Sequence, residues 1–169
     1  ARRITDPKAW CELHGLTVDR GKVTVYKAVE ADWRGGTKVD GITYAPGDKP
    51  EAPDWEKTAA CGAGLHFVAR PWEGDRYLDQ PPAHYVACVV RVSEMAVIDQ
   101  DKVKARRVVA PIVECDIQRV RSVATQVGQV AKVAQTADAH HHAVEEEKRI
   151  PLDAGDGAKY VEPKLAPEI

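Results

Sequence analysis

Serine nucleophiles and phosphate-binding loops are almost absent from this sequence. Its serines are Ser93 and Ser122, and no Gly-x-Ser-x-Gly segment occurs, which excludes the nucleophile turn of the common serine hydrolases. The short segment from Gly62 to Gly64 lacks the remaining residues of the glycine-rich loops that hold nucleotide phosphates. Local motifs of these kinds therefore assign no reaction to the chain.

Long apolar runs and a strong net charge are also missing. No run approaches the roughly 18 apolar residues of a membrane-spanning helix, and no charged-then-apolar leader indicates a secretory signal peptide. The net charge is −2, so no general attraction to nucleic acid is expected. We therefore expect neither a membrane nor a nucleic-acid partner.

Metal-binding patterns are weak. The four cysteines form no Cys-x-x-Cys pair, although three pairs have ligand-like spacing: Cys11 with His14, Cys61 with His66, and His84 with Cys88. No second tight pair completes a zinc pattern, and nothing supplies an obvious group to orient a catalytic Cys–His pair. We expect buried, reduced thiols, no metal and no cofactor.

The first two thirds of the chain predict a compact domain. Asp6 followed by Pro7 is typical of a helix start, and we expect a short helix over residues 7–14. Runs rich in β-branched residues predict strands, at residues 23–29, 41–44, 65–68, 84–92, 97–98 and 108–115. Residues 1–116 are therefore expected to form one α+β domain with a small mixed or antiparallel β-core. The basic run over residues 102–107 is interpreted as a solvated hairpin.

The last third changes character. Apolar or small residues recur at a 3–4 spacing, at Val120, Val123, Val127, Val130, Ala134, Ala137 and Val144. This narrow stripe predicts a long helix over residues 117–149 that oligomerises, docks on a neighbouring subunit, or lies across its own domain. Residues 150–169 are rich in Pro, Gly and charge, which predicts an extended tail.

Residues 23–117 resemble a family of small uncharacterised domains found in phages and prophages. The segments that carry the resemblance are residues 25–29, Tyr44 with Gly47, residues 61–67, residues 85–92 and residues 104–114. The resemblance implies a phage-related context, in a virion or in the host cytoplasm. We expect a non-catalytic structural or interaction component of a phage-like assembly, such as a capsid decoration or head–tail accessory protein. An alternative is a small regulatory protein that binds a host factor.

A second, weaker resemblance is to the ADP-ribosyltransferases. It rests on Tyr26-Lys27-Ala28, on the Gly-Leu-His-Phe step at His66, and on Glu114 in a late strand. Lys27 stands where that family has a histidine, and His66 stands where it has a ring-stacking tyrosine. The resemblance implies a catalytic set of Lys27, His66 and Glu114. It also implies a set that binds a nicotinamide dinucleotide: Tyr26, Gly64, His66 and Tyr85. An enzyme of this fold, or an inactive relative of one, is thus the alternative to a structural protein.

Overall fold

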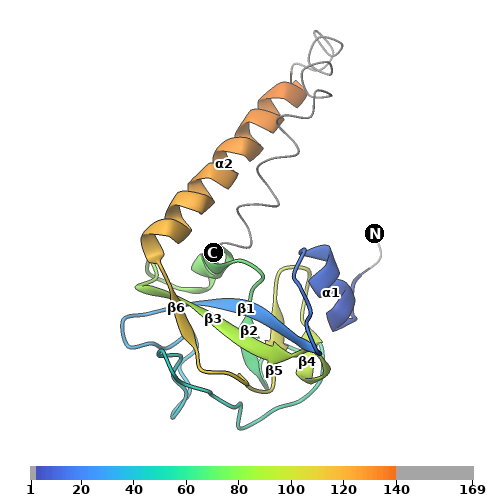
Figure 1. Cartoon of the computed structure of the whole chain (residues 1–169), viewed down its shortest axis with the longest axis vertical. Helices are drawn as coiled ribbons and strands as arrows, with labels where there is room; N and C mark the ends of the chain where they lie inside the picture. The colour runs from blue at the N-terminus through green and yellow to red at the C-terminus, as the bar shows by residue number, and fades with distance from the viewer. Residues whose placement is uncertain (1–2, 140–169) are drawn as a thin grey trace. The chain divides into compact units, whose positions relative to one another are not determined.

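The computed structural model describes residues 3–139, with side chains up to residue 130. It has a short N-terminal helix, antiparallel sheets and a C-terminal helix, which confirms the α+β prediction (Figure 1). The elements follow one another in the order α1 (Pro7–Leu13), β1 (Lys22–Val29), β2 (Leu65–Phe67), η1 (Pro71–Tyr77), β3 (His84–Arg91), η2 (Val92–Glu94), β4 (Met95–Val97), β5 (Val103–Ala105), β6 (Val113–Cys115) and α2 (Ile117–Ala139). The described residues divide into two units, the first ending at Cys115 and the second beginning at Asp116.

Helix α1 begins where its sequence predicts. The side chain of Asp6 accepts a hydrogen bond from the main-chain N–H of Ala9, and Pro7 occupies the first turn. Trp10 is fully buried, and its indole N–H donates to the carbonyl oxygen of Gln100 at 2.9 Å. The cap fixes the start of the helix, and Trp10 anchors it to the loop after β4.

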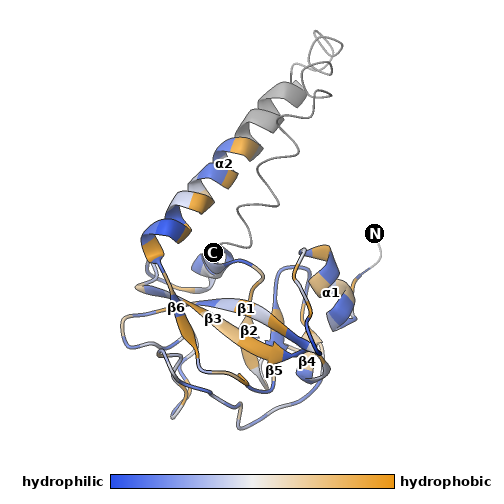
Figure 2. Cartoon of the chain, viewed as in Figure 1, coloured by the Kyte–Doolittle hydropathy of each residue, from blue (hydrophilic) through white to orange (hydrophobic). Residues whose placement is uncertain are grey.

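The first sheet has the strand order β1-β3-β6 and is antiparallel throughout. Strand β3 lies at its centre, and Figure 2 shows it as an almost continuous hydrophobic segment. Val86, Cys88 and Val90 are fully buried on one face of β3. On β1, the alternation places Val23, Val25 and Val29 in the core.

The second sheet has the order β2-β5-β4, also antiparallel. It meets the first sheet at a bridge between Tyr26 and Val68, whose main-chain groups exchange two hydrogen bonds of 2.9 Å. Apolar side chains from both sheets, including Val25, Phe67 and Val103, belong to one core cluster. The two sheets thus share a single hydrophobic core.

Strand β5 corrects one prediction. The basic run over residues 102–107 was expected to be a solvated hairpin. Strands β4 and β5 do form an antiparallel hairpin, but Val103, Lys104 and Ala105 are fully buried as the central strand of the second sheet. Antiparallel neighbours on both sides satisfy the main chain of this strand. The lysine at its centre hid the strand signal, because a buried lysine is rare.

Two other strand predictions need revision. Residues 41–44 form a turn and loop instead of a strand: Gly41 has φ +77°, and Tyr44 N–H donates to the carbonyl oxygen of Trp33. The strand expected over residues 108–115 is shorter and consists of β6 alone. Before β6, the main-chain N–H of Val109 donates to the carbonyl oxygen of Val89 in β3. Of the cysteines, Cys61 is exposed although a buried thiol was expected; the other three are buried.

Close approach of main-chain segments explains why glycine occupies positions 36 and 74. A Cβ on Gly36 would lie 2.3 Å from the carbonyl oxygen of Tyr77, and a Cβ on Gly74 would lie 2.9 Å from the main-chain nitrogen of Ala28. Distances below 3.0 Å are not tolerated between such atoms. Gly36 therefore lets the loop after β1 reach η1, and Gly74 lets η1 pack directly on β1.

The second unit contains α2, whose start is capped by Asp116. Its carboxylate accepts hydrogen bonds from the main-chain N–H groups of Gln118 and Arg119. Val120 and Val123 are buried, whereas Val127 and Val130 are about half exposed. The remaining positions of the expected stripe, Ala134, Ala137 and Val144, lie outside the residues whose side chains are described, as does the expected tail. In the described part of the chain, no helix has the length and hydrophobicity to cross a membrane.

Candidate ligand-binding pocket

A pocket of about 360 Å³ opens in the first unit beside β1 and β2. Its lining comes from segments that are far apart in the sequence: residues 26–28 of β1, the loops at residues 35–44, 52–54 and 61–64, residues 65–68, the η1 region and Lys102. The glycines at 35, 36, 62, 64 and 74 belong to this lining. The pocket is therefore bordered by several loops, and glycines in these loops leave their main chains without side chains at its edge.

Lys27 occupies a core-facing position of β1. It alternates with Val25 and Val29, both fully buried, so an apolar residue is expected there. Its ammonium group donates a hydrogen bond to the main-chain carbonyl oxygen of His66 at 2.8 Å. It also lies 4.8 Å from the ring centre of Tyr44 and 5.7 Å from that of Phe67.

Burial lowers the pKa of Lys27 to about 8. The nearby positive charge of Lys102 acts in the same direction, while Cys88 opposes it. Gly35 makes room for this side chain, because a Cβ there would lie 2.8 Å from Lys27 Cε. The protein thus holds an amine with a low pKa at the wall of a pocket.

His66 lies next to this amine on β2 and is partly buried. Its Nε2 accepts a hydrogen bond from the main-chain N–H of Gly62 at 3.2 Å, so the neutral ring carries its proton on Nδ1. Burial, followed by the charges of Lys27 and Lys102, lowers the pKa of His66 to about 4. The imidazole is therefore neutral at physiological pH.

Two further lysines flank the histidine: Lys104 lies within β5, and Lys102 directly precedes this strand. Lys104 is paired across the strands with His66 and is fully buried; its Nζ donates to Gly62 O at 3.1 Å and to Thr58 Oγ1 at 3.3 Å. Lys102 is partly exposed, with its Nζ 3.7 Å from Cys61 Sγ and 4.8 Å from the ring centre of Tyr77. Both charges contribute to the low pKa of His66.

These three ammonium groups are not neutralised by acids. Among the described residues, no carboxylate forms an ion pair with Lys27, Lys102 or Lys104. Asp54 is the acidic member of the pocket lining, within the part of the chain that the structure describes. The electrostatic character of the pocket is therefore positive.

The structure brings together four of the six residues that the ADP-ribosyltransferase resemblance implies. Tyr26, Lys27, Gly64 and His66 all line the pocket. Tyr85 does not: it is buried, and its hydroxyl donates to Asp75 Oδ1 at 2.7 Å.

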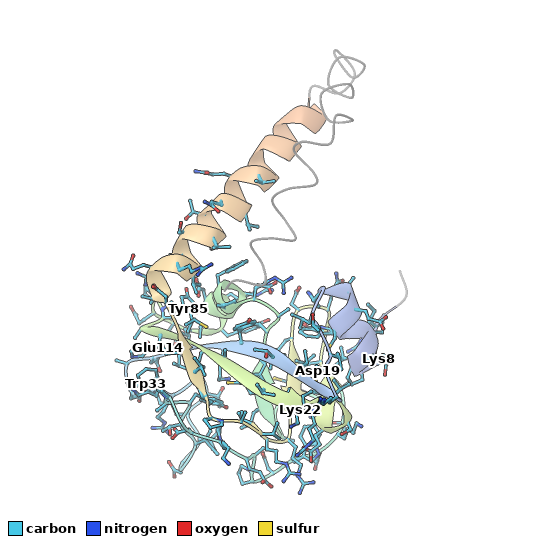
Figure 3. All side chains as sticks on the ribbon, viewed as in Figure 1. Lys8, Asp19, Lys22, Trp33, Tyr85 and Glu114 are labelled. Atoms are coloured by element: carbon cyan, nitrogen blue, oxygen red, sulfur yellow. The ribbon has the colours of Figure 1, made fainter. Side chains whose placement is uncertain are left out.

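Glu114, the sixth of these residues, is also absent from the lining. Its Oε2 lies 2.8 Å from His84 Nδ1, and the ring of His84 stacks on Trp33 with 3.6 Å between centres. Figure 3 labels Trp33 and Glu114, which lie at the same end of the first sheet. The expected glutamate is thus engaged by His84 instead of by Lys27 and His66.

The sequence did not single out Lys104 of β5 or Lys102 directly before it as site residues. Lys102 and Lys104 are two residues apart, and in a strand this spacing places both on one face. The Lys-Val-Lys-Ala alternation was a usable strand signal, although the charge of the run favoured a position exposed to solvent. The role of Gly35 and Gly36 carries no such signal, because it depends on contacts with Lys27 and Tyr77.

The three cysteine–histidine pairs with ligand-like spacing do not gather into a larger cluster among the described residues. Among the residues that the structure describes, no three His, Cys, Asp or Glu side chains are arranged to hold a metal ion. Besides the Asp54 carboxylate and the Cys61 thiol, the pocket contains amines, a neutral imidazole and main-chain amides. Such groups bind anions and can attack electrophilic carbon.

Comparison with known proteins gives a family but no activity. Residues 23–122, more than half of the chain, match the family DUF7666, which is described as a domain of unknown function. No curated protein and no solved structure matches the chain. The matched region begins in β1 and ends within α2, and it contains every lining segment of the pocket. The chain therefore belongs to the DUF7666 family.

Proposed function

We propose that the first unit is a binding domain for a small anionic molecule, held in the pocket beside Lys27. The observation that carries the proposal is the pair of pocket-lining lysines beside His66, Lys27 and Lys102, which have no carboxylate partner among the described residues. Lys104 does not line the pocket, but it adds a third positive charge near His66. Uncompensated charge in a partly buried site is costly, and a bound anion removes that cost. Low dielectric in the pocket also strengthens the attraction to the anion.

The other walls favour an organic ligand over a simple inorganic ion. The lining includes apolar and aromatic side chains: Val39, Ile42, Tyr44, Leu65, Phe67, Tyr77 and Leu78. Small-molecule sites commonly combine such walls with a few polar groups that fix orientation. We therefore propose a ligand with a planar or apolar body and at least one anionic group.

A nicotinamide dinucleotide is one member of this ligand class. The presence of Tyr26, Lys27, Gly64 and His66 in the lining supports it. The position of Glu114 beside His84 argues for binding without ADP-ribosyl transfer. A non-catalytic binding domain, as an inactive relative of that fold, is thus our preferred form of this alternative.

Titration calorimetry of the full chain tests the proposal. The probes are inorganic phosphate, ADP and oxidised nicotinamide adenine dinucleotide. The test variants are Lys27→Met and Lys102→Gln, and the matched control is Lys49→Gln at an exposed lysine outside the lining. We expect ADP or the dinucleotide to bind, with about tenfold weaker binding in each pocket variant and unchanged binding in the control. Absence of binding by all three probes, or equal binding in all variants, contradicts the proposal.

A second candidate function is an assembly role through α2, in the phage-like context that the sequence resembles. The supporting observation is that Val127 and Val130 are 46% and 51% exposed at helical spacing. Sedimentation of the full chain beside the double variant Val127→Gln, Val130→Gln tests it. An oligomer that becomes a monomer in the variant supports assembly. A monomer in both cases contradicts self-association and leaves the regulatory alternative, in which a host factor binds the helix.

A further inference from the structure

Lys27 is an unusual choice for its position. It lies between two fully buried valines on the inner side of β1, where an apolar side chain would stabilise the core without a desolvation cost. Anion binding alone does not require a lysine there, because Lys102 lines the same pocket and remains partly exposed. The surroundings of the Lys27 amine therefore bear on a second role.

Those surroundings place uncharged groups around the amine, with Lys102 as a nearby cation. Its Nζ has one hydrogen-bond acceptor, the carbonyl oxygen of His66 at 2.8 Å, and two aromatic rings, those of Tyr44 and Phe67. No carboxylate among the described residues pairs with it to hold the charged form. Lysines that act as nucleophiles toward carbonyl groups are placed in this way, desolvated and beside other cations.

We propose that Lys27 forms a reversible imine with an aldehyde or ketone group of the pocket ligand, whose anionic group Lys102 holds. The inference rests on the proposed function, since it names the chemical class of the same ligand. Only the neutral amine attacks a carbonyl carbon. With a pKa of about 8, about a fifth of the Lys27 side chains are neutral at pH 7.4, compared with about a thousandth for an ordinary lysine.

The step balances without an oxidant or reductant. The nitrogen lone pair forms a bond to the carbonyl carbon as the C=O π bond breaks. The oxygen takes up a proton and the nitrogen releases one, which gives a neutral carbinolamine. Loss of the hydroxyl group as water, with its second proton supplied through solvent, gives the protonated imine. Addition of water reverses the sequence and releases the ligand with its carbonyl intact.

The pocket has a volume of about 360 Å³, and two glycines nearby make room for neighbouring side chains. Gly35 and Gly64 both face crowded side chains, because a Cβ on Gly35 would lie 2.8 Å from Lys27 Cε and one on Gly64 would lie 3.1 Å from Lys104 Cδ. The absence of a side chain at Gly35 leaves space for Lys27 in the pocket lining, and its absence at Gly64 leaves space for Lys104 and Trp55. Lys102 near the Tyr77 ring provides a cation for the ligand's anionic group on the same lining.

Pyridoxal 5′-phosphate is a suitable probe, because it combines an aldehyde, an aromatic ring and a phosphate. The full chain is incubated with the probe at pH 8, reduced with borohydride, digested, and mapped by mass spectrometry. We expect the reduced adduct at Lys27 at substoichiometric probe, at least about tenfold above exposed lysines such as Lys8 and Lys49. Lys27→Arg should abolish this adduct while keeping the positive charge. Pyridoxal without phosphate should label Lys27 less efficiently.

The outcomes separate the imine from the proposed function. If calorimetry shows that ADP or the dinucleotide binds but the adduct spreads over exposed lysines and leaves Lys27 unmodified, the imine inference is overturned and anion binding stands. If no anion binds and Lys27 is not labelled, both fail. Labelling of Lys27 in the unmodified chain supports the imine whether or not the Lys27→Arg variant folds.

Discussion

Lys27 Nζ and His66 O are joined by a hydrogen bond of 2.8 Å that links the two sheets. One residue earlier in β1, Tyr26 makes the main-chain bridge to Val68. Adjacent residues of β1 therefore contact the second sheet in two ways, by backbone and by side chain. The backbone bridge joins the two sheets independently of the Lys27 side chain.

The first prediction concerns the stability of Lys27→Met. Methionine has a similar length, retains the packing against Tyr44 and Phe67, and removes a desolvated charge. We expect the free energy of unfolding at pH 7 to change by less than about 1 kcal/mol, in either direction. Urea unfolding followed by circular dichroism measures it, with Lys49→Gln as the control.

The pH dependence gives this variant a second readout. The pKa of Lys27 is lowered in the folded state to about 8, so between pH 8 and about 10.5 the unfolded chain binds more protons than the folded one. The contribution of Lys27 to stability therefore rises across this window. Lys27→Met should lose that rise. A variant that is destabilised by more than about 2 kcal/mol at pH 7 would show that the Lys27–His66 bond is mainly structural.

The second prediction concerns His66 and acid. Its pKa in the folded state is lowered to about 4, so below pH 6.5 the unfolded chain takes up a proton that the folded chain does not. Stability from the neutral ring is present above pH 6.5 and is lost as pH falls toward 4. The loss amounts to up to about 3 kcal/mol.

His66→Gln separates this contribution from that of the carboxylates. The glutamine oxygen can accept the N–H of Gly62 as Nε2 does, but it does not titrate. We expect the wild type to lose stability relative to the variant between pH 6.5 and 4, in urea titrations at several pH values. Parallel curves for the two proteins would contradict the lowered pKa.

The third prediction tests the close approach at Gly36. A methyl group there meets the carbonyl oxygen of Tyr77, a main-chain atom that cannot move independently. We expect Gly36→Ala to lower the free energy of unfolding by about 2 kcal/mol or more and to weaken ligand binding, since Gly36 lines the pocket. Chemical denaturation measures the loss.

Gly128→Ala is the matched control for Gly36→Ala. Gly128 lies in α2, and nothing stands within 4 Å of a Cβ built on it. Alanine is favoured over glycine inside a helix by about 0.5–1 kcal/mol, so the helical signal should rise or stay equal. Equal destabilisation by the two substitutions would show that steric conflict with Tyr77 is not the cause.

Particular residues show how much of the fold can be predicted from the sequence alone. Local signals are strong at Asp6 and in β3, where a capping residue and a β-branched run act through near neighbours. They are weak where tertiary contacts decide, as at Lys104, whose burial depends on β2 and β4 pairing on both sides. A charged run looks solvated until its sheet partners are known.

In the candidate site too, local sequence signals identify some residues, whereas tertiary contacts decide the others. The Gly-Leu-His-Phe step drew attention to His66, and the pocket does form beside it. The partners of His66 come from residues 27, 62, 102 and 104, which no sequence spacing relates. Glu114 shows the converse, because its late-strand position suggested the site while its side chain contacts His84.

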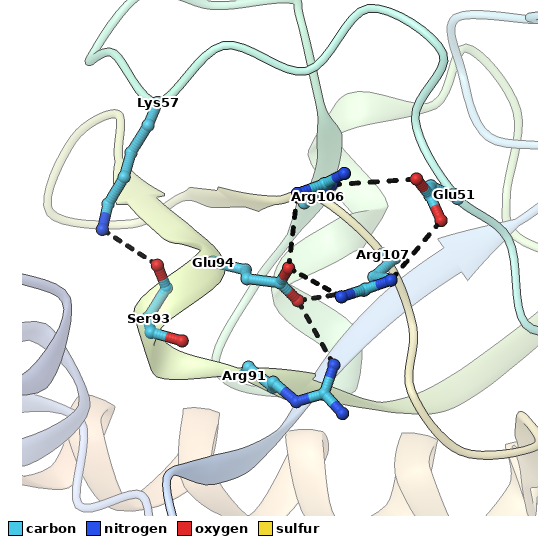
Figure 4. A network of polar contacts seen from close by, with 7 residues as sticks. All are labelled: Glu51, Lys57, Arg91, Ser93, Glu94, Arg106 and Arg107. Carbon is cyan, nitrogen blue, oxygen red and sulfur yellow. Dashed lines mark hydrogen bonds and ion pairs between the residues drawn. The ribbon is translucent and has the colours of Figure 1, made fainter.

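The fourth prediction concerns the ion-pair network around Glu94, which Figure 4 shows. Its carboxylate accepts two hydrogen bonds from Arg107, at 3.1 and 3.0 Å, and lies within 4 Å of Arg91 and Arg106. Its side chain is only 15% exposed, and the hydrogen bonds to Arg107 lower its pKa. The network ties the end of β3 to the residues that follow β5.

Glu94→Gln should lower the free energy of unfolding by about 1–2 kcal/mol at pH 7, because it weakens a bidentate, charge-assisted pair. The matched control is Glu51→Gln, whose carboxylate also faces Arg106 and Arg107 but at 3.7 and 3.8 Å and with 51% of its side chain exposed. Exposed pairs of this kind contribute little, so its effect should stay below about 0.5 kcal/mol. The difference between the two variants should shrink as pH falls, since protonation of Glu94 removes the same charge. Equal effects of both substitutions at pH 7 would show that burial and bidentate geometry do not distinguish the two carboxylates.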